Sequence, residues 1–124
     1  MNRDIDRKAM KLEYKQARRP MGIFRVRNSV RDLSFIGSAS DLPAMLNRQR
    51  AQLSMGAHAN RALQQDWNDL GSEAFVFEVL DELTPLDQPG YDPADDLQAL
   101  EELWLDRLSP YDERGYNKAP KQNQ

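Results

Sequence analysis

One carboxylate lies where a charge is expected to need a partner. Glu101 falls in a predicted helix and borders its apolar stripe, because Leu97 precedes it by four residues and Trp104 follows it by three. The next residue, Glu102, is expected to face water. A carboxylate at the edge of a core requires a cation, a hydrogen-bond donor or a metal ion. Glu101 is therefore the first candidate metal ligand; the alternative is that it reaches outward into solvent.

A second polar residue, Gln49, lies on an apolar helical stripe, one turn after Met45. The only histidine, His58, comes just before another predicted helix, where a surface or capping role is expected rather than a ligand role. With one histidine and no cysteine, the sequence excludes a His/Cys zinc site and Cys–His catalysis. The aromatic residues follow strand or helix periods, which favours core positions over base-stacking platforms.

The segments that must position these residues alternate between the strand and helix periods. Strands are expected over 22–27 and 33–37, helices from Ser40 or Asp41 to about 54 and over about 60–70, a strand over 75–80, a loop over 84–96 and a helix over 95–108. The expected fold class is α/β (more narrowly α+β), with a small three-stranded, mainly antiparallel sheet flanked by helices.

Length and composition favour one soluble domain. The 124 residues fit a single core, and 30% are charged. No apolar run approaches the roughly 20 residues that cross a bilayer, so no membrane partner is expected, and a cytoplasmic location is the default. The expected organisation is a basic N-terminal helical arm over residues 1–20, a domain over 21–120 and a disordered tail over 121–124.

Charge is unevenly distributed along the chain, although the net charge is only −3. Residues 1–31 carry ten Lys or Arg against three acids, whereas residues 75–124 carry four against twelve. The basic end suits a phosphate backbone. The alternative is a solvated helix face.

Two tripeptides carry a family resemblance. Gly22-Ile23-Phe24 is followed, after a ten-residue spacer, by Phe35-Ile36-Gly37. Further landmarks come in order: Gly56-Ala57-His58-Ala59-Asn60, Gly71, Glu101 before Trp104, and Gly115-Tyr116-Asn117. Over about residues 21–120 the sequence resembles the GIY-YIG nuclease superfamily.

The resemblance implies phosphodiester hydrolysis with one divalent metal ion, Mg²⁺ or Mn²⁺, which Glu101 would hold. Both signature tyrosines are replaced, by Phe24 and Phe35, so no hydroxyl remains to assist the attacking water. The positions of a phosphate-binding arginine and of a histidine are Met45 and Gln49.

Two further residues complete the catalytic candidates that the resemblance implies. Arg48, one turn from Met45, would take the place of the missing arginine. Asn117 matches the asparagine of the closing motif, where a supporting role is expected. The candidate set is Phe24, Phe35, Arg48 and Asn117, with Glu101 as the metal ligand.

Three functions stay open from the sequence. The first is a metal-dependent endonuclease, slowed by the lost groups. The second is a silent domain that binds nucleic acid, with DNA favoured, through one face bearing Arg25, Arg27, Arg48 and Arg50. The third is a protein-interaction module that keeps only the fold.

Overall fold

The computed structural model describes residues 19–120. The elements are β1 (Met21–Asn28), β2 (Leu33–Ala39), α2 (Leu42–Ser54), α3 (Arg61–Leu70), η1 (Ser72–Ala74), β3 (Phe75–Leu83), α4 (Ala94–Leu108) and η2 (Asp112–Arg114). This order confirms the expected succession of strands and helices. The helix expected over 2–17, most of the arm over 1–20 and the tail over 121–124 lie outside the described residues.

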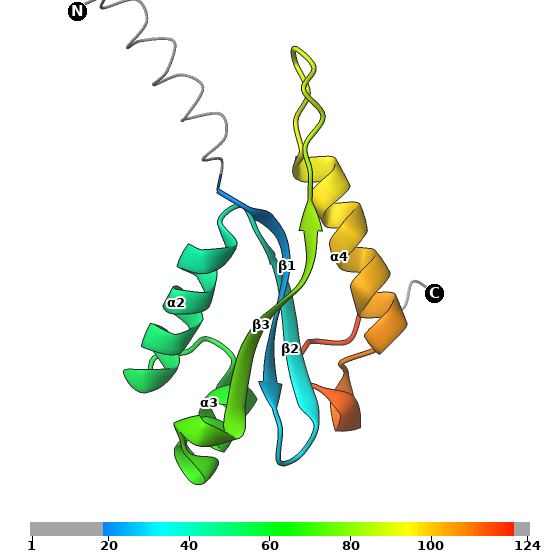
Figure 1. Cartoon of the computed structure of the whole chain (residues 1–124). Helices are drawn as coiled ribbons and strands as arrows, with labels where there is room; N and C mark the ends of the chain where they lie inside the picture. The colour runs from blue at the N-terminus through cyan, green and yellow to red at the C-terminus, as the bar shows by residue number, and fades with distance from the viewer. Residues whose placement is uncertain (1–18, 121–124) are drawn as a thin grey trace, which may run out of the picture.

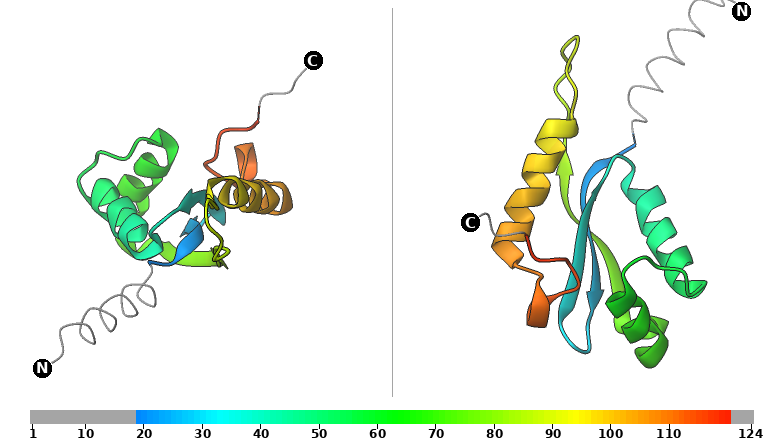
Figure 2. Two further views of the ribbon diagram at one scale, coloured as in Figure 1. Left: turned by 90° about the horizontal axis from the view of Figure 1, so that it is seen from above. Right: turned by 180° about the vertical axis from the view of Figure 1, so that it is seen from behind.

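The three strands form one antiparallel sheet in the order β2-β1-β3. Figure 1 shows α2 and α3 covering one face of this sheet and α4 covering the other, and the view from behind in Figure 2 shows the same layers. The expected fold class is confirmed. Because the sheet is covered on both faces, β1 must be apolar on both, and its central stretch is buried almost throughout.

Successive residues of the strands alternate between two separate cores. On the face toward α2 and α3, Phe24 and Val26 pack in one cluster with the helix leucines Leu42, Leu53 and Leu63. On the face toward α4, Ile23 and Ile36 are 0% and 1% exposed.

Strand β3 contains a β-bulge, and it is longer than the sequence predicted. Ile23 pairs with Asp81, whereas Phe24 pairs with Val79, which leaves Leu80 without a partner of its own. The extra residue turns Asp81 toward α4, where its carboxylate accepts a hydrogen bond of 3.0 Å from the Trp104 indole N–H. Pairing with β1 resumes after the bulge and continues to Leu83, so the strand does not end at Leu80 as expected.

Polar side chains cap the starts of α2 and α3, and Asp41 is one of the two residues expected to begin the first of these helices. The Asp41 side chain accepts from the backbone N–H of Ala44 at the start of α2, and Asn60 accepts from that of Leu63 at the start of α3. Gly71 ends α3 with a φ of 86°, in the region that favours glycine.

The C-terminal segment is joined to the rest of the domain by a buried polar network. The Tyr116 hydroxyl donates to Asp66 of α3 at 2.7 Å and accepts from the Asn28 amide at 3.0 Å. Arg31, in the turn between β1 and β2, donates to the other Asp66 oxygen at 2.8 Å. The network thus ties together the hairpin, α3 and the end of the chain.

Within residues 19–120, no helix is both long enough and apolar enough to span a membrane.

Replacing Tyr116 with Phe is expected to lower the free energy of unfolding by about 1–3 kcal/mol, because one Asp66 oxygen and the Asn28 amide lose a buried partner. Denaturant titration would measure this as a lower midpoint at an unchanged slope. Tyr111→Phe, a half-buried tyrosine of the same segment outside this network, is the matched control. An equal effect of the two substitutions would contradict the assigned role of the hydroxyl.

The same pair of proteins gives a pH test. Burial and the Asp66 carboxylate raise the pKa of Tyr116 above its ordinary value of 10.0. Above pH 10 the unfolded chain loses this proton while the folded chain keeps it, so stability falls as the pH rises. The stability difference between the native protein and Tyr116→Phe is therefore expected to narrow above pH 10. A constant difference would contradict the assigned burial.

Candidate active site

The two signature motifs meet where the central strand pairs with β2. The Phe24 ring lies against the backbone of Gly37, where an added Cβ would come within 2.7 Å of the ring's Cζ atom. Glycine is therefore required in the second motif because of the ring in the first. The Phe35 ring lies beside that of Phe24, with a centroid separation of 6.3 Å.

A series of contacts connects the Phe35 ring through His58 to Gln49 and Met45 of α2. The His58 ring meets the Phe35 ring edge-on at 5.5 Å. Its Nδ1 atom accepts from the backbone N–H of Asn60, so the proton of the neutral ring resides on Nε2, which donates to Gln49 Oε1. The Gln49 amide in turn contacts the Met45 sulfur at 3.5 Å.

His58 is buried, at 8% exposure, so the surface position is wrong, whereas the bond that its Nδ1 accepts from Asn60 just before α3 agrees with the expected alternative of a capping role. Desolvation lowers its pKa from 6.5, although the bond from Asn60 partly opposes this shift. The sequence carried one signal of the contact between His58 and Gln49. Because Gln49 lies on an apolar helical stripe, the pattern indicates a buried amide that needs a polar partner. The identity of that partner could not follow from helical spacing, because His58 lies beyond the end of α2.

Glu101 reaches the same strand from the opposite face of the sheet. Its side chain is half-buried, whereas Glu102 is exposed, which confirms the predicted orientation of this helix. Glu101 Oε2 accepts a hydrogen bond of 3.2 Å from the Ser38 hydroxyl. Among residues 19–120, no lysine, arginine or histidine forms an ion pair with Glu101.

Asn117 holds the outer edge of β2. Its side-chain amide accepts from the Ile36 N–H at 2.9 Å and donates to the Ile36 C=O at 2.8 Å. Since β2 is an edge strand, this amide replaces the hydrogen bonds that another strand would make. The contacts give Asn117 a positioning role beside Gly37 and Ser38.

The donor set around Glu101 suits one kind of metal site. The described part of the chain contains no group of three or more His, Cys, Asp or Glu side chains that would enclose a metal ion. Mg²⁺ keeps several of its waters and is often bound by one or two carboxylates together with substrate phosphates. A single carboxylate next to a hydroxyl suits such an ion. These two groups are too few for a metal ion whose ligands all come from the protein.

Two solved structures are similar to the chain over most of its length. The catalytic domain of homing endonuclease I-TevI has a TM-score of 0.66 and 26% sequence identity, covering 81% of this chain and 99% of that domain. A mutant of the catalytic domain of intron endonuclease I-TevI has the same TM-score and 24% identity, covering 83% of this chain and 97% of the other. The chain is a GIY-YIG-like domain. No protein-family model and no curated sequence matches it.

The four arginines predicted to bind nucleic acid do not share one face of the GIY-YIG-like domain. Arg25 pairs with Glu78 and Arg27 with Asp32, on the side of the sheet that α4 covers. The Arg50 guanidinium lies over the Phe77 ring, 4.5 Å from its centroid, on the opposite side.

Arg48 lies on the flank of α2 opposite to that of Arg50. Arg48 and Arg50 precede and follow the inward-facing Gln49 by one residue, so they project to opposite flanks of α2. Since Arg50 lies over β3, Arg48 lies on the flank toward β2. The prediction that the four arginines share one face is therefore wrong. Arg25 and Arg27 lie on the α4 side of the sheet, whereas Arg48 and Arg50 belong to α2 on the opposite side. A phosphate-binding role for Arg48 stays a prediction.

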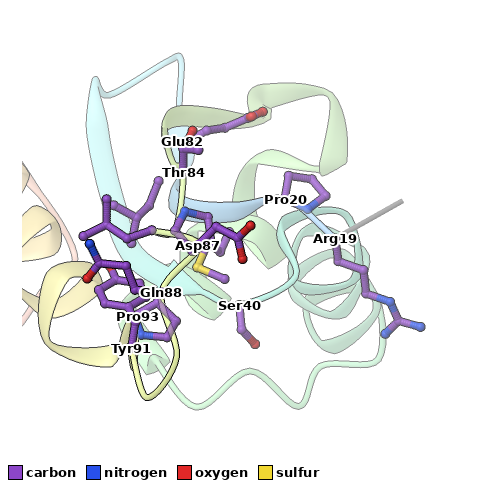
Figure 3. Close-up of a pocket in the computed structure, with 13 residues that line it drawn as sticks. Arg19, Pro20, Ser40, Glu82, Thr84, Asp87, Gln88, Tyr91 and Pro93 are labelled. Atoms are coloured by element: carbon purple, nitrogen blue, oxygen red, sulfur yellow. The ribbon is translucent and has the colours of Figure 1, made fainter. Parts of the chain in front are cut away.

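A hollow of about 750 Å³ lies at the end of the sheet where β1 begins. Figure 3 shows Asp87, Gln88 and Tyr91 of the loop before α4 on one side and Ser40 on the other, with Arg19 directed away. Glu82 and Asp87 make its lining acidic. Neither the Phe35–His58 pair nor Glu101 lines this hollow, so it is separate from the candidate site.

The single histidine allows a direct test of the site. Because burial lowers its pKa, the His58 ring is expected to titrate below pH 6.5 and to carry its neutral-state proton on Nε2. Nitrogen NMR of the imidazole would report both properties without overlap from other histidines. Gln49→Leu removes the acceptor of the Nε2 proton and should shift the Nε2–H signal. A titration at or above pH 6.5 would contradict the buried neutral ring.

Proposed function

We propose that this GIY-YIG-like domain hydrolyses phosphodiester bonds of nucleic acid, with DNA as the first substrate to test, and that it uses one Mg²⁺ or Mn²⁺ ion held by Glu101. One observation carries the proposal. The half-buried Glu101 carboxylate has a hydroxyl partner but no cation within residues 19–120, and it lies beside the strand that carries the second signature motif. A bound metal ion would supply the missing positive charge.

The residues around Glu101 would orient it for this task. The Ser38 hydroxyl donates to one carboxylate oxygen and leaves the other for a ligand. Asn117 fixes the strand on which Ser38 stands. When bound, the metal ion would neutralise the charge that develops on the phosphate and on the leaving oxygen.

The replaced groups predict slow hydrolysis. A general acid or base contributes roughly 10²–10⁴-fold, and a preorganised charge-stabilising donor about 10²–10³-fold. Phe24 and Phe35 provide no hydroxyl, and Met45 provides no charge. Losses within one catalytic unit do not simply multiply. Arg48, on the β2 flank of α2, is the residue that we expect to bind the scissile phosphate in place of Met45.

A second function is favoured by the contacts of His58. Both of its ring nitrogens are engaged, with Asn60 and with Gln49. A ring in this state has no free atom with which to accept a proton from water. A catalytically silent domain that binds nucleic acid would keep the same fold and the same Glu101 position.

The cleavage of supercoiled plasmid in Mg²⁺ or Mn²⁺ separates the two functions. The native protein is expected to nick DNA slowly and only with metal. Glu101→Ala is expected to reduce the rate by about 10²–10³-fold, the scale for loss of one charge-stabilising group. Glu102→Ala removes the same charge one residue away, on the exposed side of α4, and should leave the rate unchanged.

Equal nicking by the native protein and both variants would indicate a contaminating nuclease and would contradict the proposal. No nicking by any of them, with salt-sensitive binding to the same DNA, would support the silent domain instead.

A further inference from the structure

A second hollow, of about 320 Å³, lies beside the C-terminal end of α4. Its lining comes from β1, the turn before β2, β2 itself, the end of α4 and the segment up to η2: Arg25, Asp32, Ser34, Leu108, Pro110 and Arg114. In Figure 1 this is the region where α4 ends and the chain turns back toward the sheet. The hollow therefore faces the same layer of the molecule as Glu101, but at the far end of the helix.

Basic groups outnumber acidic groups in the lining of this hollow. Arg25 and Arg27 are held by Glu78 and Asp32, respectively. Arg114 forms no ion pair with any residue of the described part of the chain. The charged side chains that line the hollow itself are Arg25, Arg114 and Asp32, so its lining carries a net positive charge.

The hydrogen-bonding groups suit a phosphate. Guanidinium groups bind phosphate oxygens through two parallel N–H bonds, and a serine hydroxyl donates a third. Arg25 comes from β1 and Arg114 from η2, and Ser34 lies in β2 on the same face as Arg25, with Arg27 as its paired residue. The Asp32 and Glu78 contacts fix Arg25 and Arg27 in place before a ligand arrives.

We propose that this hollow binds a phosphate of the nucleic-acid backbone and so sets the position of the strand relative to Glu101. The proposal rests on the proposed function for its role in cleavage. Ser34 and Ser38 share one side of β2 and are separated by four residues, or about 13 Å. The bound phosphate would therefore lie about 13 Å along β2 from the Ser38 hydroxyl that donates to Glu101.

A binding experiment with the full chain tests the hollow without requiring cleavage. The affinity for a labelled DNA duplex would be measured in EDTA at several salt concentrations. Arg114→Gln is expected to weaken binding and to reduce the slope of log K against log salt by about 0.9, the value for one lost phosphate contact. Ser34→Ala should weaken binding with an unchanged slope, because it removes no charge.

The control is Arg61→Gln, which removes an exposed arginine at the start of α3, on the opposite side of the sheet. If Arg114→Gln and Arg61→Gln change the affinity and the slope equally, only net charge matters and the proposed phosphate site is wrong. A specific effect of Arg114→Gln in a protein that never cleaves DNA would uphold the site while the proposed hydrolysis fails. If neither Arg114→Gln nor Ser34→Ala changes binding or cleavage, the phosphate site is wrong, whereas the proposed hydrolysis is unaffected.

Discussion

The outer edge of β2 has no neighbouring strand, and the C-terminal segment covers only part of it. The Tyr116 N–H donates to the Ser34 C=O, and Asn117 makes both hydrogen bonds to Ile36. Outward-directed backbone groups recur at every second residue of an edge strand, so the next position is Ser38. The Ser38 side chain lies on the face toward α4, where its hydroxyl donates to Glu101. The cover on this edge therefore ends where the candidate site begins.

The covering segment is held by contacts that leave little freedom. Gly115 passes so close to Pro110 that an added Cβ would lie 2.3 Å from the Pro110 carbonyl oxygen. The Tyr116 side chain then enters the core and reaches Asp66. The Gly115-Tyr116-Asn117 motif therefore has a structural role. Gly115 permits the close contact with Pro110, Tyr116 anchors the segment in the core, and Asn117 holds β2 beside the candidate site.

The sheet also divides the site into two halves. Phe24, Phe35 and His58 belong to the layer between the sheet and α2, whereas Glu101 belongs to the layer of α4. Only β2 separates the halves, and Figures 1 and 2 show α2 and α4 on either side of it. The positions at which the sequence departs from the family's pattern, Phe24, Phe35, Met45 and Gln49, all lie in the α2 half, whereas Glu101 lies in the other half.

Local features were predictable from the sequence, whereas contacts between distant segments were not. Apolar spacing located the helices and strands, side chains that accept backbone N–H groups located their starts, and helical geometry oriented Glu101. The burial of His58 depends on Gln49 in another element, and the bulge at Leu80 depends on how β3 pairs with β1. The arginines were misgrouped because spacing along one strand or helix does not reveal which layer of the fold its neighbours occupy.

The central claim is that Glu101 is a metal ligand, and it can be tested apart from catalysis. Substoichiometric Mn²⁺ broadens the amide NMR signals of nearby residues by paramagnetic relaxation. If Glu101 holds the metal ion, the Gly37 and Ser38 signals should broaden in the native protein and in Glu102→Ala, but not in Glu101→Ala. The signal of Phe75, at the opposite end of the sheet, serves as the internal reference. Equal broadening of Gly37 and Ser38 in all three proteins would contradict the claim.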